Sequence, residues 1–211
     1  MRLTDAPPDV LARFNEPGHW FTAYPSLNHW RDDFGHTEYC AALSHYLKHE
    51  LWQGGLQLYI HIPFCKKLCH YCICNVVISN DRAKIQFFVD HLLREIDNLR
   101  AFHEREGLSP NIRKIHLGGG TPSHLDRAQF ASLMERLNAL SPLSAMDEVA
   151  MEIDPRTVTQ DDLRHYAAHG VNRISFGVQD FDPQVQSAIN REQPPEMIEN
   201  LLEVRGLFKG V

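Results

Sequence analysis

The chain has 211 residues, of which 43% are hydrophobic and 23% are charged, and these proportions are typical of a globular protein rather than a disordered one. With 21 Lys and Arg against 27 Asp and Glu, the net charge is −6, which argues against a general nucleic-acid or anionic-membrane surface because both need a basic excess. No run approaches the roughly 18 apolar residues of a membrane span, and the first ten residues lack the basic and apolar segments of a secretory signal. We therefore expect a cytoplasmic protein that binds neither nucleic acid nor membranes.

The first 55 residues are predicted to form an N-terminal extension, irregular apart from one helix. Prolines and a glycine interrupt the aromatic stretch at residues 14–25, which is typical of a loop. Residues 37–49 have helical spacing, with one apolar side formed by Tyr39, Leu43, Tyr46 and Leu47.

A regular alternation of strands and helices is predicted over residues 56–211. The predicted strands cover residues 56–62, 112–117, 149–153 and 172–178, and the predicted helices cover residues 81–104, 126–140, 160–169, 182–189 and 195–208. This alternation predicts an α/β fold made of four βα units around a parallel sheet. A closed eight-unit barrel takes about 250 residues, so we expect a partial (β/α) barrel in a truncated chain, with an open edge at the last strand.

Four of the five cysteines lie within ten residues, in the loop after the first predicted strand: Cys65, Cys69, Cys72 and Cys74. Such clustering in a chain without an export signal indicates metal or cluster binding rather than a disulfide framework. The spacing C-x3-C-x2-C allows three thiolates to bind three irons of an iron–sulfur cube and leaves the fourth iron open. A zinc site, with four cysteines or with three and His70, stays open as an alternative, although the second paired knuckle usual for zinc is absent. The isolated Cys40 is predicted to be a small buried apolar residue.

Further candidate residues follow the other three predicted strands, at the edge of the sheet where barrel enzymes have their sites. Gly118, Gly119 and Gly120 after the second strand would let a ligand approach the backbone and leave amides free to bind it. Glu152 in the third strand is predicted to lie opposite Met151 and to need a partner, for which a ribose diol is suitable. An ion-paired or helix-capping acid explains Glu152 equally well. Gln179 and Arg191 follow the fourth strand, and Arg191 could bind a carboxylate through two parallel hydrogen bonds.

Taken together, these stretches resemble the radical S-adenosylmethionine (SAM) superfamily, whose hallmark is C-x3-C-x2-C in the first βα loop. A narrower resemblance, from about residue 14 to residue 211, is to the family of oxygen-independent coproporphyrinogen III oxidases, and it lies in the segments YIHIPFCKKLCHYCICN, HLGGGTP, EIDPR, RISFGVQDF and NREQ. The resemblance implies that residues 56–211 form the N-terminal part of a radical SAM (β/α) barrel. The last barrel strands and a C-terminal domain that covers the substrate are then absent.

The resemblance also implies cofactors and site residues. It implies a 4Fe–4S cluster with three cysteine ligands, Cys65, Cys69 and Cys72, with Cys74 beside the cluster but not a ligand. It implies two SAM molecules, the first of which binds the open iron and contacts Tyr59, Gly119 and Glu152. The positions that match contacts of the second SAM are Tyr71, Gly120, Thr121, Gln179 and Arg191.

The implied reaction is the oxidative decarboxylation of coproporphyrinogen III to protoporphyrinogen IX in haem biosynthesis, by a monomer that receives electrons from an unidentified donor. Because the chain lacks the remaining barrel strands, we expect it to be inactive alone. Three residues depart from the family pattern and bear on the substrate: His19 and Trp20, where Pro and Arg are usual, and Ile73, where Gly is usual. The alternatives are a related haem-handling protein, either chaperone-like or a haem-degrading methyltransferase, and a zinc-binding structural module.

Overall fold

The computed structural model describes residues 7–9, 12, 29–49 and 55–211. Two compact units divide the chain, Met1–Leu43 and Ser44–Val211. The division falls inside helix α2 (His36–His49). This helix confirms the one predicted at residues 37–49, and none of its side chains is buried. The predicted loop at residues 14–25, with His19 and Trp20, lies outside the described residues. The predicted domain boundary after residue 55 stays a prediction.

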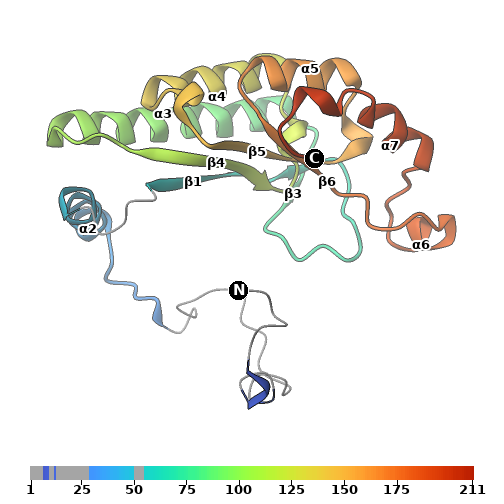
Figure 1. The fold of residues 1–211 in the computed structure, drawn as a ribbon, viewed down its shortest axis with the longest axis horizontal. Coiled ribbons are helices and arrows are strands. Elements are labelled where there is room, and N and C mark those ends of the chain that lie inside the picture. The colour runs from blue at the N-terminus through green and yellow to red at the C-terminus, as the bar shows by residue number, and fades with distance from the viewer. Residues whose placement is uncertain (1–6, 10–11, 13–28, 50–54) are drawn as a thin grey trace. The chain divides into compact units, whose positions relative to one another are not determined.

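Four parallel strands form the main sheet of the second unit, as predicted (Figure 1). They are β1 (Leu56–Ile62), β4 (Ile112–Gly119), β5 (Glu148–Ile153) and β6 (Arg173–Phe176), and they lie side by side in chain order. Because all three pairings between these strands are parallel, the carboxyl ends of the four strands meet at one edge.

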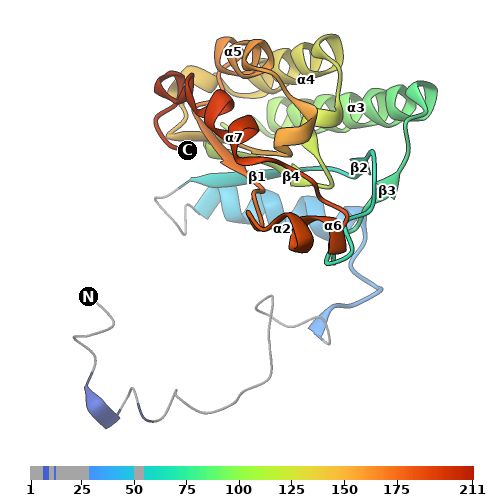
Figure 2. The same cartoon turned by 90° about the vertical axis from the view of Figure 1, so that its right-hand side faces the viewer.

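Helices α3 (Arg82–Glu106), α4 (Arg127–Leu140) and α5 (Gln160–Ala168) cover one face of this sheet, as both views show (Figures 1 and 2). Each helix begins at a side-chain cap. The Asp81 carboxylate accepts hydrogen bonds from two amides at the start of α3, and Asp126 and Thr159 form capping boxes at α4 and α5. Gly107, in the left-handed conformation with φ 65°, ends α3. None of the helices in the described part of the chain is both long and apolar enough to cross a membrane.

The two faces of the sheet differ because successive side chains of a strand point in opposite directions. The face toward the helices is apolar and contributes fully buried residues to the core, among them Ile62, Ile115, Leu117, Met151 and Ile174. The opposite face, by contrast, carries polar and largely exposed side chains on the described residues: Tyr59, His61, His116 and Glu152.

The structure differs from the predicted elements at three places. A two-stranded parallel sheet, β2 (Phe64–Cys65) with β3 (Val77–Ile78), closes the base of the cysteine loop, and strands this short have no recognisable periodicity. Helix α6 (Pro183–Ala188) matches its prediction, but α7 (Pro195–Leu202) ends earlier than predicted and a 3₁₀ turn, Arg205–Leu207, follows it. The predicted open edge of the last strand is partly paired, because the Ile174 amide donates to the Gly210 carbonyl at 3.1 Å.

Candidate functional site

A cavity of about 620 Å³ lies at the carboxyl ends of the strands, and its size is that of an ordinary small-molecule site. It brings together the site residues predicted from the sequence, except Tyr59, Gly118 and the alternative zinc ligand His70. The residues that line it include Cys65, Cys69, Cys72, Tyr71, Gly119, Gly120, Thr121, Glu152, Gln179 and Arg191. Four strand-to-helix connections contribute to this list, so the cavity is a product of the parallel topology.

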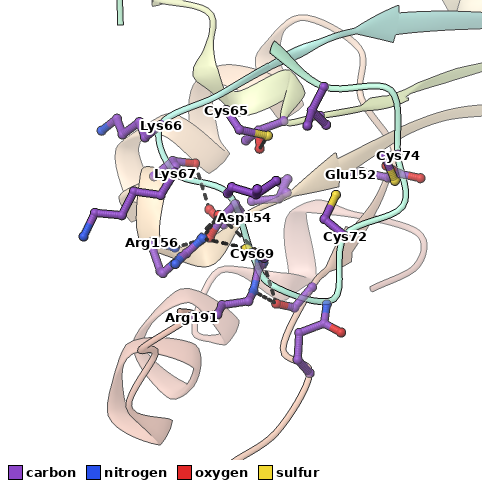
Figure 3. A pocket seen from close by; sticks show the side chains of 18 of the residues that line it. Cys65, Lys66, Lys67, Cys69, Cys72, Cys74, Glu152, Asp154, Arg156 and Arg191 are labelled. Atoms are coloured by element: carbon purple, nitrogen blue, oxygen red, sulfur yellow. Dashed lines mark hydrogen bonds and ion pairs between the residues drawn. The ribbon is translucent and has the colours of Figure 1, made fainter. Parts of the chain in front are cut away.

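The cysteine loop is fastened at its base by backbone hydrogen bonds. The Val77 amide donates to the Pro63 carbonyl at 2.7 Å, and the Ser79 amide donates to the Cys65 carbonyl at 3.1 Å. Within the loop, the Cys72 amide donates to the Cys69 carbonyl at 3.0 Å, which forms a turn between these two cysteines. The loop therefore has a defined path, and its three predicted ligands lie on different parts of the cavity wall (Figure 3).

This arrangement fits a polynuclear cluster. In the described ranges, no three His, Cys, Asp or Glu side chains come close enough together to bind one metal ion. In an iron–sulfur cube each thiolate binds a different iron, so the ligand sulfurs surround the group instead of meeting at a point. Three cysteine sulfurs distributed around one cavity meet that requirement.

Cys65 is half-buried beside a hydroxyl group. Its Sγ lies 3.2 Å from the Oγ1 of Thr121, the residue that follows the glycines after β4. Burial raises the pKa of the Cys65 thiol, and the Thr121 hydrogen bond opposes that shift. Burial likewise raises the pKa of Cys74, and the neighbouring Cys72 thiol adds to the shift. Cys74 lies beside Glu152 at the edge of the cavity (Figure 3).

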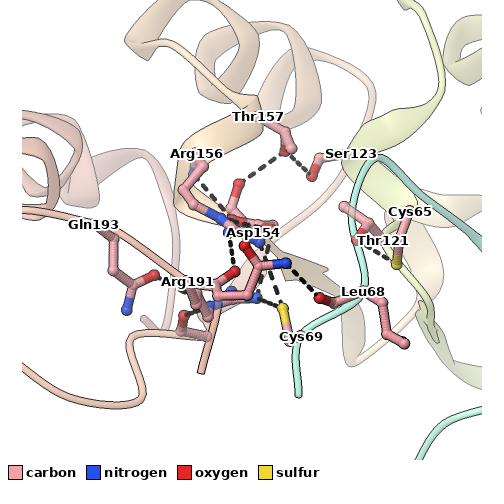
Figure 4. A network of polar contacts seen from close by, with 12 residues as sticks. Cys65, Leu68, Cys69, Thr121, Ser123, Asp154, Arg156, Thr157, Arg191 and Gln193 are labelled. Carbon is pink, nitrogen blue, oxygen red and sulfur yellow. Dashed lines mark hydrogen bonds and ion pairs between the residues drawn. The ribbon is translucent and has the colours of Figure 1, made fainter. Parts of the chain in front are cut away.

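Cys69 is buried in a different environment, which is cationic. Arg191 Nη1 and Arg156 Nη2 donate to its Sγ at 3.4 and 3.6 Å. Both guanidinium groups also contact Asp154, at 3.4 Å from Arg191 and 2.7 Å from Arg156 (Figure 4). Burial disfavours the charged form of Asp154, but the hydrogen bonds and charges of the two arginines outweigh it and hold the pKa of this carboxyl below its usual value.

The segment after α6 also holds the cysteine loop by its backbone. The His70 amide donates to the Ile189 carbonyl at 3.0 Å, and the Asn190 side-chain amide donates to the Leu68 carbonyl at 2.8 Å. Asn190 has φ 55°, a left-handed conformation that asparagine tolerates. The NREQ segment therefore positions the middle of the cysteine loop, in addition to lining the cavity.

Arg191 is more enclosed than its polar sequence context predicts, with only 7% of its surface exposed. Its Nη2 and Nε donate to the Gly177 carbonyl at 2.7 and 3.1 Å, and Nε also lies 3.2 Å from Gln193 Oε1. Because four of its five N–H groups already have partners, a carboxylate that binds Arg191 through two parallel hydrogen bonds must replace at least one of them. Arg191 also holds the cysteine loop through its contact with the Cys69 sulfur, a role that the sequence did not predict.

Gly119, the last residue of β4, and Gly120, which follows it, are required by close packing within the chain. A Cβ on Gly119 would meet the His61 ring at 2.8 Å, and one on Gly120 would meet the Pro63 carbonyl oxygen at 2.6 Å. The prediction that these amides are free is wrong for Gly120, whose N–H donates to the Ile62 carbonyl at 2.8 Å. Gly119, with φ 112°, adopts a backbone conformation that favours glycine.

Glu152 has a partner on the same face of the sheet, as its position in β5 predicted. His116 Nε2 lies 3.0 Å from Glu152 Oε1, and the Tyr59 ring stacks on His116 with centroids 6.0 Å apart. The Tyr59 hydroxyl in turn lies 3.0 Å from His61 Nδ1. The neighbours of Glu152 on this face are thus polar. Tyr59 belongs to this row of side chains and lies outside the cavity lining.

Two further predicted residues reach the cavity from loops. Burial raises the pKa of Tyr71 to about 12, so the phenol stays neutral at physiological pH and its ring is available for stacking. Gln179, three residues after the end of β6, has φ 67°, a left-handed conformation that is uncommon for glutamine. Such strain at a cavity is typical of functional positions.

Sequence reasoning did not identify Asp154 and Arg156 as site residues. Both belong to the EIDPR segment, and Asp154 caps the short 3₁₀ turn Pro155–Thr157 at the carboxyl end of β5. Their position directly after a strand of a parallel sheet was available from the sequence. The contact of Arg156 with Cys69, which is 87 residues away along the chain, was not.

Comparison with known families gives a match over most of the chain. The model of the family described as the radical SAM superfamily matches residues 59–209, which include all the predicted ligands and cavity residues.

Individual relatives agree with this match. The oxygen-independent coproporphyrinogen III oxidase of Escherichia coli (strain K12) is 37% identical over 193 residues, which are 92% of this chain and 40% of that protein. The protein of the same name from Pseudomonas aeruginosa is 35% identical, over 92% of this chain and 42% of that protein. The solved structure of coproporphyrinogen III oxidase (HemN) from Escherichia coli, a radical SAM enzyme, superposes with a TM-score of 0.79 at 34% identity, covering 94% of this chain and 43% of that chain. This chain thus spans about 40% of the length of the curated relatives that it matches.

Proposed function

Because this chain belongs to the radical SAM superfamily, we propose that Cys65, Cys69 and Cys72 bind three irons of a 4Fe–4S cluster in the cavity and leave the fourth iron for SAM. The observation that carries this proposal is the position of these cysteines, which line one cavity with the glycine segment after β4 and with Glu152. Cys74 lies at the same cavity, one residue beyond the third ligand, and we keep it as a neighbour of the cluster.

The bound cofactors supply one-electron cleavage of SAM and so start radical chemistry on a substrate. The chain's own residues bind and orient. The Glu152 carboxylate, held through one oxygen by His116, has its other oxygen available for the hydroxyl groups of a ribose. Tyr71 offers a neutral ring for stacking. Gln179 offers a side-chain amide from the loop after β6. The Thr121 hydroxyl contacts the Cys65 sulfur, and Thr121 also lines the cavity.

The two-SAM assignment is part of the proposal. Tyr59, Gly119 and Glu152 are assigned to the first SAM, and the second has the assigned contacts Tyr71, Gly120, Thr121, Gln179 and Arg191. Arg191 would bind the second carboxylate through two parallel hydrogen bonds only by giving up at least one of its contacts to Gly177, Gln193, Asp154 or Cys69. Tyr59 would reach the first SAM from the open face of the sheet.

For the complete protein we propose the oxidative decarboxylation of coproporphyrinogen III to protoporphyrinogen IX, supported by the names of relatives that match 92% of this chain. Each of two propionate groups would lose a hydrogen atom from its β-carbon to the adenosyl radical that cleavage of SAM supplies. It would then lose CO₂, pass one electron to a separate acceptor, and become a vinyl group. We further propose a cytoplasmic monomer that takes electrons from a separate donor.

The first test is anaerobic reconstitution of the chain with iron and sulfide, followed by iron, sulfide and zinc analysis. We expect about four irons per chain and no zinc, and we expect Cys65→Ala, Cys69→Ala and Cys72→Ala each to lose the cluster. Cys40→Ala is the matched control and should keep it. Equal iron loss from the control would contradict the ligand assignment, and cluster loss in Cys74→Ser would favour a four-cysteine metal site.

The second test separates the enzyme from its haem-handling relatives. The reconstituted chain is given SAM and dithionite, and 5′-deoxyadenosine and methionine are measured by mass spectrometry. A version extended to the length of the relatives is then given coproporphyrinogen III. Formation of protoporphyrinogen IX supports the proposal, whereas methyl transfer to haem, or haem binding without decarboxylation, would replace it with one of the alternatives.

A further inference from the structure

The three proposed ligands differ in the groups that contact their sulfurs. The Cys65 sulfur contacts one neutral hydroxyl, that of Thr121, at 3.2 Å. The Cys69 sulfur contacts two guanidinium groups, those of Arg156 and Arg191, at 3.6 and 3.4 Å (Figure 4). Hydrogen bonds from an ionised donor are roughly twice as strong as neutral ones. The protein therefore stabilises the negative charge of Cys69 more than that of Cys65.

The direction of the Arg156 guanidinium group is fixed by its other bonds. Its Nε donates to both carboxylate oxygens of Asp154, at 3.0 and 3.2 Å, and Nη2 donates to Oδ2 at 2.7 Å. Nη1 donates to the Asn190 carbonyl at 3.2 Å, so all three nitrogens have partners before Cys69 is considered. This bidentate pairing leaves Nη2 aimed at the Cys69 sulfur.

Asp154 is itself held in place, with only 9% of its surface exposed. Its Oδ1 accepts the Arg156 backbone amide at 3.0 Å, and its Oδ2 also lies 3.4 Å from Arg191 Nη1. One carboxylate thus braces two arginines beside one sulfur. The group of charges is positive overall, with two guanidinium groups against one carboxylate, and it lies at the cavity wall.

We infer that Arg156, braced by Asp154, is a positioning residue that sets the reduction potential of the cluster through Cys69. This inference rests on the proposed function, since it needs a cluster bound by Cys69. Reduction adds one negative charge to the cluster. Donated N–H groups and a nearby positive charge stabilise the reduced state more than the oxidised state, so they make the potential more positive.

The test is a potentiometric titration of the reconstituted cluster in the absence of SAM. Electron paramagnetic resonance measures the reduced cluster at each potential. In Arg156→Gln, which removes the charge, we expect the midpoint potential to fall. The expected fall corresponds to about a tenfold change in the ratio of oxidised to reduced cluster, which for one electron is about 59 mV. Arg156→Lys keeps the charge but loses the fork, so its potential should lie between those of Arg156→Gln and the wild type.

Two variants serve as matched controls. Arg127→Gln breaks an exposed pair with Asp162 and should leave the potential at the wild-type value. Thr121→Val removes the neutral contact to Cys65 and should shift the potential less than Arg156→Gln.

The outcomes separate the inference from the proposed function. Because the potential belongs to the clusters that form, partial occupancy in a variant does not obscure it. An unchanged potential in Arg156→Gln, even with lowered iron content, would overturn the inference and leave a merely structural role. Failure of both Arg156 variants to bind iron would overturn it as well, because Arg156 would then be needed for assembly. A wild-type chain that binds no cluster would instead refute the proposed function.

Discussion

The two ends of the parallel sheet both carry arginine–carboxylate pairs, but in different surroundings. At the amino end, Arg113 pairs with Asp147 at 2.7 Å, with 44% and 54% of the two side chains exposed. At the carboxyl end, Asp154 pairs with Arg156 at the same 2.7 Å, with only 9% and 20% exposed. The ionic groups and the distance of the two pairs are the same, but the carboxyl-end pair is more buried and its carboxylate also contacts a second arginine, Arg191.

This comparison shows why one end of the sheet suits a site. An exposed pair gains little, because water and salt screen it and two long side chains must be ordered. A buried pair holds its geometry strictly, because breaking it leaves a charge without water or a partner. The buried pair at the carboxyl end therefore holds the side chains beside Cys69 in place, whereas the pair at the amino end is exposed and positions no site residue.

The largest expected effect follows from removing the shared carboxylate. Asp154→Ala leaves two arginines beside one another without their acceptor, and we expect the free energy of unfolding to fall by about 3–5 kcal/mol at pH 7. Urea unfolding of the cluster-free chain, with circular dichroism as the signal, measures this change. A fall below about 1 kcal/mol would show that the carboxyl-end pair behaves like a surface pair.

The pH dependence of that difference sharpens the comparison. Because the pKa of Asp154 is lowered in the folded chain, its pairing stabilises the fold fully above the ordinary Asp pKa of about 4 and is lost as the pH falls through the lowered value. The difference in unfolding free energy between the wild type and Asp154→Ala should thus stay constant from about pH 5 to 8 and shrink below about pH 4. A difference that is independent of pH would mean that the charge of Asp154 contributes nothing.

Two glycines, one at the cavity and one in a turn after α7, extend the contrast to packing. In Gly120→Ala the new Cβ would lie 2.6 Å from the Pro63 carbonyl oxygen, a backbone atom that cannot move aside freely. We expect a loss of about 1–3 kcal/mol, as for overpacked sites, with displacement of the cysteine loop. Gly206→Ala, in the 3₁₀ turn after α7, meets no atom within 4 Å and should be neutral. Thermal unfolding of both variants checks the pair, and equal effects would contradict it.

The smallest effect is expected at the amino end. Asp147→Ala breaks the exposed pair with Arg113, and its cost should be below about 1 kcal/mol and should decrease further in 1 M salt. The same urea measurement applies. A cost near that of Asp154→Ala would remove the distinction between the two ends of the sheet.

Much of the fold was predictable because its causes are local. The strand predicted at residues 56–62 coincides with β1, since its apolar pattern and the proline after it lie in one short segment. Helices α3 and α4 begin at Asp81 and Asp126, whose capping side chains act within three residues. Where local patterns were short or mixed, as in β2, β3 and the end of α7, the prediction missed the element or its length.

The candidate site divides in the same way. The three proposed ligands and the glycine segment were predictable from the sequence. The C-x3-C-x2-C spacing lies within one loop, and three consecutive glycines are visible without knowledge of any distant contact. The direction of Glu152 also followed from alternation along β5, although its partner His116 did not.

Only the tertiary structure decided how the ligands differ from one another. The contacts that distinguish Cys69 join it to Arg156 and Arg191, which are 87 and 122 residues away along the chain. The same holds for the Cβ clash that requires Gly120 and for the burial of Arg191. A sequence pattern records spacing along the chain, whereas a hydrogen bond and a desolvated charge depend on distances that exist only when the parallel strands have brought their loops to one edge.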